Sequence, residues 1–149
     1  MKRILSIIIT GFLAGAFAFG GLAPASASTG TRALHITKEC SEFHGLAGQF
    51  CTITSSNVRA IPVGSRVFYL KAADFTIGQL DSDIVLYTGP GNNALGHVVL
   101  NFATGTGTVT LNGGTGKFED FHARVAVSFI GDSTHPDWAW NGTYHFKDD

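Results

Sequence analysis

Short runs of β-forming residues, separated by turn-forming residues, constrain the fold of this chain most. Val, Ile, Thr, Phe and Tyr gather in these runs, and Gly, Asn, Asp and Pro lie between them. After residue 27, no stretch of about eleven residues carries a sustained apolar stripe at helical spacing. This pattern is typical of a β-sandwich or a β-barrel. We predict strands over Leu34–Lys38, Phe50–Ser55, Arg66–Leu70, Asp74–Gly78, Asp83–Tyr87, His97–Phe102, Thr106–Leu111, Arg124–Ile130 and Trp138–Phe146.

The alternation of side chains within these runs predicts which face of the sheet is buried. In the last run the apolar face holds Trp138, Trp140, Gly142, Tyr144 and Phe146. In the run before it, the apolar face holds Val125, Val127 and Phe129. A sheet with one apolar face must close on itself or pack against another sheet. We therefore expect an all-β fold, a single small antiparallel β-barrel of about eight strands.

The N-terminus has the pattern of a cleavable signal peptide. Met1-Lys2-Arg3 is followed by an apolar run from Ile4 to Phe19 and then by Ala25-Ser26-Ala27, whose small residues suit signal peptidase. A membrane anchor is the alternative, but the apolar run is shorter than the ~20 residues of a span. We predict a signal peptide over 1–27, a barrel domain over 28–149, and a secreted or periplasmic protein without a later membrane span.

The charge of the mature part argues against several classes of partner. The chain has 10 basic and 11 acidic residues, and Lys2 and Arg3 leave with the signal peptide. The mature part therefore has 8 basic residues, 11 acidic residues and a net charge of −3. Nucleic acid and acidic membrane surfaces are poor partners for such a chain. The oligomeric state stays open.

The two cysteines, Cys40 and Cys51, predict a disulfide, because an isolated pair in an oxidising compartment is most simply a bridge. Metal binding by this pair is disfavoured, since no second pair with zinc-type spacing exists. The six histidines also lack ligand spacing on any one element, so we expect no metal site and no cofactor. They are His35, His44, His97, His122, His135 and His145.

One turn carries a resemblance to a known family. The segment Leu111-Asn112-Gly113-Gly114-Thr115-Gly116-Lys117-Phe118 resembles the signature turn of the allene oxide cyclase and dirigent barrel superfamily, where Gly-Gly-Ser/Thr-Gly-x-Phe follows a strand. Ala123 matches a small position that is usually Gly there, and the strand Trp140–Tyr144 looks like the last strand of small secreted bacterial barrels of this type. The glycines would allow a tight corner, and Phe118 would fold back under the barrel rim.

The resemblance implies a barrel whose cavity confines a reactive oxylipin or a radical pair for cyclisation or coupling, without a cofactor. Its active residues do not carry over well. His122 stands where dirigent proteins have Arg and allene oxide cyclases have Tyr. By alternation His122 shares a face with Arg124 and Ser128, so either this polar face lines the cavity or His122 is exposed.

Aromatic side chains give the remaining candidates for a site. We take Trp138, Trp140, Tyr144, Phe129 and His122 as the candidate ligand-binding residues. The aromatic face forms either a small apolar pocket or a filled core. The leading hypothesis is a secreted barrel that binds a small hydrophobic molecule, with cofactor-free cyclase or dirigent-type activity as its enzymatic form. The alternative is a non-enzymatic interaction module that binds a protein or glycan through its loops. A third, weaker option is a metal-assisted enzyme built on histidines at the rim of the barrel.

Overall fold

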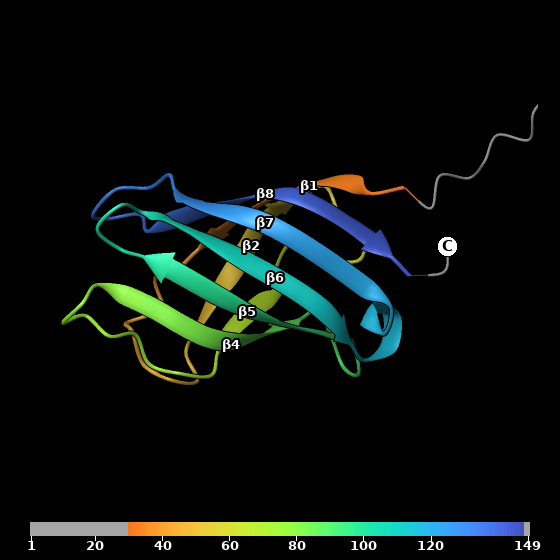
Figure 1. Ribbon diagram of the computed structural model, residues 1–149, viewed down its shortest axis with the longest axis horizontal. Helices are drawn as coiled ribbons and strands as arrows, with labels where there is room; N and C mark the ends of the chain where they lie inside the picture. Colours follow the sequence, from red (N-terminus) through yellow and green to blue (C-terminus); the bar gives the residue numbers. More distant parts are fainter. Residues whose placement is uncertain (1–29, 148–149) are drawn as a thin grey trace, which may run out of the picture.

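The computed structural model describes residues 30–147, which form one closed antiparallel β-barrel (Figure 1). The predicted signal peptide lies outside the described residues. Within them the strands are β1 (Arg32–Glu39), β2 (Phe50–Ser56), β3 (Arg66–Tyr69), β4 (Gln79–Tyr87), β5 (Asn93–Asn101), β6 (Thr106–Gly114), β7 (Phe121–Phe129) and β8 (Asp137–Phe146). A short 3-10 helix, η1 (Gly116–Phe118), lies between β6 and β7. The predicted all-β barrel is confirmed.

Each strand pairs with the next along the chain, and β1 closes the barrel against β8. This last pairing runs from Arg32 opposite Tyr144 to Glu39 opposite Asp137. Closure leaves no sheet edge exposed, which removes the usual template for strand-to-strand aggregation.

One predicted strand, Asp74–Gly78, is wrong. Asp74 and Gln79 instead close a tight turn, with backbone hydrogen bonds of 2.8 and 3.0 Å in the two directions. The Asp74 carboxylate accepts the Thr76 N–H at 2.9 Å, and Gly78 has a φ of 66°. These local Asp and Gly interactions favour a turn over the strand that the apolar alternation of Phe75 and Ile77 suggested.

The interior follows the predicted alternation. In β7 the side chains of Phe121, Ala123, Val125 and Val127 are buried, whereas those between them point outward. In β8 Trp140 is fully buried, and Gly142 faces the interior at a point where an added Cβ would collide with the Arg124 carbonyl oxygen. Glycine therefore allows β7 and β8 to approach closely as the sheet curves.

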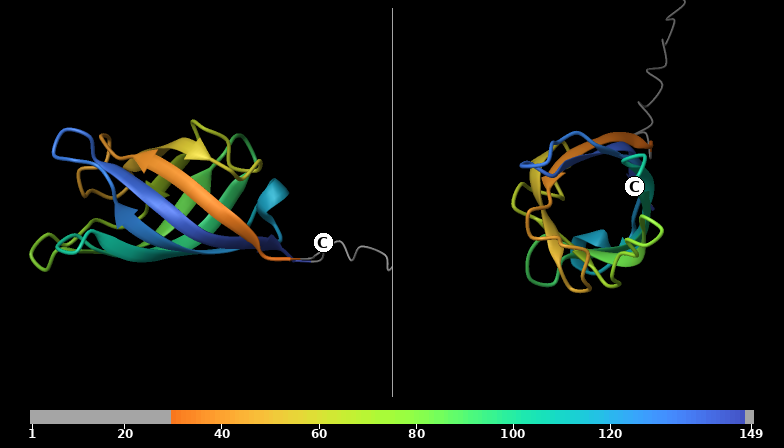
Figure 2. Two further views of the ribbon diagram at one scale, coloured as in Figure 1. Left: turned by 90° about the horizontal axis from the view of Figure 1, so that it is seen from above. Right: turned by 90° about the vertical axis from the view of Figure 1, so that its left-hand side faces the viewer.

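The two ends of the barrel are closed differently (Figure 2). At the end where β1 begins and β8 finishes, which we call the η1 end, Phe118 of η1 and Ile61 of the segment 57–65 are fully buried. At the opposite end, which we call the disulfide end, the segment 40–49 holds Cys40 and packs Phe43 against Tyr69, with 4.6 Å between ring centroids. Side chains from both ends thus add to the core.

The Gly113–Phe118 turn is the tight corner that the sequence predicted. Gly116 has a φ of 59°, and a Cβ there would lie 2.5 Å from the Gly91 carbonyl oxygen. Phe118 is fully buried, and its ring meets that of Phe121 edge-on at 5.3 Å. In residues 30–147 no helix has the length and apolar character needed to cross a bilayer.

Candidate functional site

The predicted aromatic ligand residues are spread along the barrel axis instead of forming one pocket. On β8, Trp138 is half-buried at the disulfide end, Trp140 is fully buried in the middle, and Tyr144 lies near the η1 end. Phe129 is 42% exposed and meets Trp138 edge-on, with 5.0 Å between ring centroids. Phe129 and Trp138 therefore cannot share a small ligand with Tyr144.

His122 lies on the outer face of the barrel, as the alternation of β7 suggested. It pairs across the strands with His145, and the two rings are nearly parallel, with 5.2 Å between their centroids. Both histidines line a shallow hollow of about 320 Å³ on the outside of β6, β7 and β8, which we call the outer groove. Its polar strand side chains are Thr110, Asn112, His122, Arg124, Thr143 and His145.

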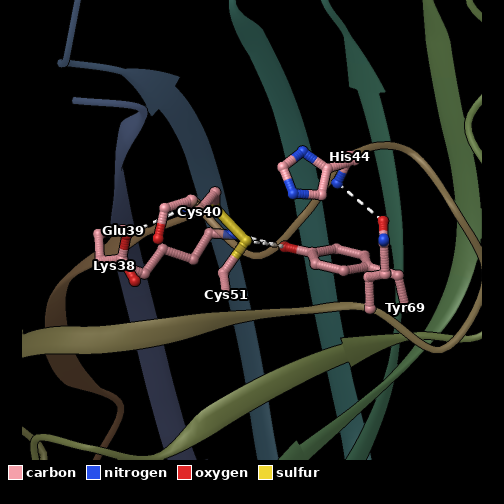
Figure 3. The surroundings of a disulfide bond; sticks show 8 residues. Lys38, Glu39, Cys40, His44, Cys51 and Tyr69 are labelled. Carbon is pink, nitrogen blue, oxygen red and sulfur yellow. Dashed lines mark hydrogen bonds between the residues drawn. A yellow bond between two sulfur atoms is a disulfide. The ribbon is translucent and has the colours of Figure 1, made fainter. Parts of the chain in front are cut away.

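The disulfide between Cys40 and Cys51 is confirmed, with sulfurs 2.05 Å apart, and it adjoins a buried lysine (Figure 3). The Tyr69 hydroxyl donates to the Cys51 sulfur at 3.4 Å and accepts a hydrogen bond from Lys38 Nζ. Lys38 Nζ also lies 5.1 Å from the ring centroids of both Tyr69 and Trp140. Contacts through Tyr69 and Lys38 thus connect the disulfide to Trp140 in the middle of the barrel.

Burial shifts the pKa values of both titratable groups beside the disulfide, Lys38 and Tyr69. Lys38 has no carboxylate partner within the described part of the chain, and burial lowers its pKa from 10.5 to about 7. Burial likewise raises the pKa of the Tyr69 hydroxyl. Trp140 Nε1 is buried without a hydrogen-bond acceptor. Our sequence interpretation missed Lys38, although the alternation of Leu34, Ile36 and Lys38 placed it on the inner face.

A second hollow, of about 380 Å³, lies at the η1 end, and we call it the mouth. Three cations and three apolar or aromatic residues line it: Arg32, Arg59, Lys117, Ala60, Tyr144 and Phe146. Arg32 belongs to β1, Arg59 to the segment 57–65, and Lys117 to η1. The aromatic side chains of the mouth, Tyr144 and Phe146, pack against the core. The centroid of the buried Phe121 ring lies 5.6 Å from that of Tyr144 and 5.2 Å from that of Phe146.

The charged residues that line the mouth are all positive. None of its three cations forms an ion pair with a carboxylate of residues 30–147, because every carboxylate contact of this kind in that range is made by a histidine. Lys117 Nζ instead lies 5.5 Å from the centroid of the Phe118 ring. An acidic group that entered the mouth would meet cationic donors on several sides without displacing a carboxylate of residues 30–147.

Histidine and carboxylate side chains do not converge into a metal site anywhere in the described barrel. The arrangement most similar to a metal site is on the outer face of β4 and β5. There His97 forms hydrogen bonds to Asp83 through Nδ1 at 2.8 Å and to Asp81 through Nε2 at 2.7 Å. The two carboxylates thus bind opposite edges of the ring. Mainly through the Asp83 bond, they raise the pKa of His97.

The mouth combines volume and apolar surface with cations that no carboxylate of residues 30–147 pairs. It contains Tyr144 from the predicted set, but neither Trp138, Trp140, Phe129 nor His122. Comparisons of the chain with protein-family models, with curated proteins and with solved structures give no match.

Proposed function

We propose that this is a secreted or periplasmic binding barrel whose mouth holds a small hydrophobic molecule that carries an acidic group. The observation that supports this most is a set of three cations, Arg32, Arg59 and Lys117, that have no carboxylate partner among residues 30–147. They surround the aromatic side chains of Tyr144 and Phe146. Three separate segments supply these cations, so the folded barrel, not one local motif, creates the site.

The dimensions and chemistry of the mouth suit an amphipathic acid. Its volume of about 380 Å³ falls within the range of small-molecule pockets, roughly 300–1,000 Å³. The hydrocarbon part would lie on the rings of Tyr144 and Phe146, and the acid would reach the guanidinium groups. Arginine suits this role because its planar fork binds a carboxylate through two hydrogen bonds.

The filled interior favours simple binding over a reaction carried out inside an enclosed cavity. Phe118 and Phe121 fill the barrel just inside the mouth, and Trp140 fills it further in. A ligand would therefore rest at the opening instead of being enclosed. Cofactor-free cyclase or dirigent-type chemistry, which the resemblance of the Gly113–Phe118 turn implies, is the enzymatic form of this proposal, and it supplies oxylipins and phenolics as ligands to try.

Two features support export. The first 27 residues have the pattern of a signal peptide. The Cys40–Cys51 bridge is of the kind that persists in oxidising compartments. Together they favour action outside the cytoplasm on a ligand that the protein meets there.

The test uses residues 28–149 with the disulfide formed. Decanoate, an oxylipin acid and p-coumarate are titrated, and decanol and p-coumaryl alcohol serve as neutral analogues of two of them. We expect at least one acid to raise the melting temperature, with a stabilisation of about 2.7 kcal/mol at a hundredfold excess over Kd. The alcohols should stabilise much less, because they leave the cations unpaired.

Variants then locate the site. Arg59→Gln and Lys117→Gln should each weaken acid binding about tenfold, which corresponds to 1.4 kcal/mol. Arg66→Gln, which makes the same charge change on the outer face of β3, is the matched control and should bind normally. If no acid stabilises the protein, or if Arg66→Gln weakens binding equally, the mouth is not the site.

The interaction-module alternative is favoured by a different observation. Several apolar side chains at the disulfide end are more than half exposed: Leu46, Leu70, Phe75, Ile77 and Ile130. Exposed apolar clusters of this kind often mark contact surfaces. If all the acids fail while Phe75→Ser and Ile77→Ser lower self-association or partner capture, this alternative replaces ligand binding.

A further inference from the structure

The outer groove brings six polar side chains into two rows across three strands. In the first row, Asn112 of β6 pairs with His122 of β7, and His122 pairs with His145 of β8. In the second row, Thr110 pairs with Arg124, and Arg124 pairs with Thr143. Members of the two rows on each strand are two residues apart, so the rows are separated by about 7 Å.

All six side chains can donate hydrogen bonds, as can Thr31 at the edge of the groove, and no carboxylate of residues 30–147 lines it. Arg124 is exposed and has no ion-pair partner among residues 30–147. Neutral histidine and asparagine each offer N–H donors, and threonine offers a hydroxyl. This donor-rich surface, with one fixed positive charge, is complementary to an anion.

We propose that the outer groove binds a tetrahedral oxyanion ester, a phosphate or sulfate monoester with a polar carbon body. An oxyanion seated between the rows would lie next to donors of both, because the rows are only about 7 Å apart along the strands. Its oxygens point in several directions, so it can engage both rows. A planar carboxylate would satisfy Arg124 but would leave most of the other donors without an acceptor. The volume of about 320 Å³ exceeds that of the bare ion and leaves room for the body of an ester.

This site is distinct from the mouth, because no residue that lines the outer groove also lines the mouth. It also gives His122 a binding role, which a ligand inside the barrel could not provide because His122 lies on the outer face. The pairing of His122 with His145 presents two imidazoles on one side of the groove, and Arg124 lies in the adjacent row. A polar ester body would lie beside the second row, within reach of the hydroxyl groups of Thr110 and Thr143.

The test is an NMR titration of residues 28–149 with glucose 6-phosphate and with glucose 6-sulfate. Glucose and glucuronate serve as the neutral and the planar-carboxylate controls. We expect backbone and imidazole shifts confined to Thr110, Asn112, His122, Arg124, Thr143 and His145, with much weaker effects from both controls. Binding of both esters, or of either alone, at these residues supports the proposal and identifies the preferred oxyanion.

Two variants check that the contact is specific. Arg124→Gln should weaken ester binding at least tenfold, and His122→Gln together with His145→Gln should weaken it further. Arg66→Gln is the matched charge control and should leave the affinity unchanged. The proposal is overturned if millimolar ester causes no shifts, if the shifts centre on Arg32, Arg59 and Lys117, or if Arg66→Gln weakens binding as much as Arg124→Gln.

Discussion

Lys38 Nζ donates a hydrogen bond to the Tyr69 hydroxyl in the interior of the barrel, and no carboxylate of residues 30–147 balances its charge. An uncompensated buried ammonium is costly, so the amine loses its proton near pH 7 instead of near 10.5. The pair is therefore a source of pH-dependent stability.

We expect the free energy of unfolding to rise with pH between about 7 and 9.5. In this window the unfolded chain keeps the lysine proton that the folded chain has lost, so each added pH unit favours the folded state by up to about 1.4 kcal/mol. Urea denaturation at several pH values measures the rise. Lys38→Met should abolish it and should be more stable than wild type at pH 7, whereas the exposed Lys71→Met should retain it. A wild-type curve that is flat over this range would contradict the shifted pKa.

The Cys40–Cys51 bridge should contribute about 3 kcal/mol, as the closure of a short loop predicts. Replacing both cysteines by serine should lower the melting temperature by roughly ten degrees. Exported, unreduced protein should contain no titratable thiol. Free thiol in such material would show that the bridge does not form during export.

The Gly113–Phe118 turn should tolerate no β-branched residue at its tight points. A Cβ at Gly114 would collide with the Asn93 carbonyl oxygen, and one at Gly116 with the Asn92 side chain. Gly114→Val and Gly116→Val should each destabilise the barrel by more than 1 kcal/mol in urea melts. Gly91→Ala is the control, because Gly91 has a positive φ but no atom near its Cβ direction, and it should cost less.

Trp140 should behave as a core residue. Its side chain is fully buried, and Trp140→Ala should destabilise the protein by about 3–5 kcal/mol. Trp138→Ala should cost less, because Trp138 is half-buried at the disulfide end. Denaturant unfolding compares the two. If both substitutions lowered the free energy of unfolding by the same small amount, the middle of the barrel would be loosely packed.

The fold could be predicted because the relevant information is local and repeated. The alternation of Val125, Val127 and the residues between them indicates a buried and an exposed face, and sheets of this kind close. The prediction failed at Asp74–Gly78, where the hydrogen bond from Thr76 to the Asp74 carboxylate and the positive φ of Gly78 favour a turn. Turn chemistry competes with alternation over such a short distance.

The candidate site could be predicted only in part, because chain closure assembles it. Tyr144 was found through the aromatic face of the last strand, but Arg32 and Arg59 show no pattern in the sequence. They meet Tyr144 because β1 pairs with β8 and the segment 57–65 covers the same end. Lys38 was missed for a different reason, since an interior lysine violates the usual rule that charges lie outside.

The pairing of β1 with β8 also sets the orientation of the molecule on any support. Arg32 lies opposite Tyr144, so the chain enters and leaves the barrel side by side at the η1 end (Figure 2). A tag or tether at either terminus would therefore turn the mouth toward the surface that holds it and present the disulfide end to solution. A circular permutant that joins the two termini and opens the chain at 88–92 would keep its new ends at the η1 end, whereas opening it within 102–105 would reverse the presentation.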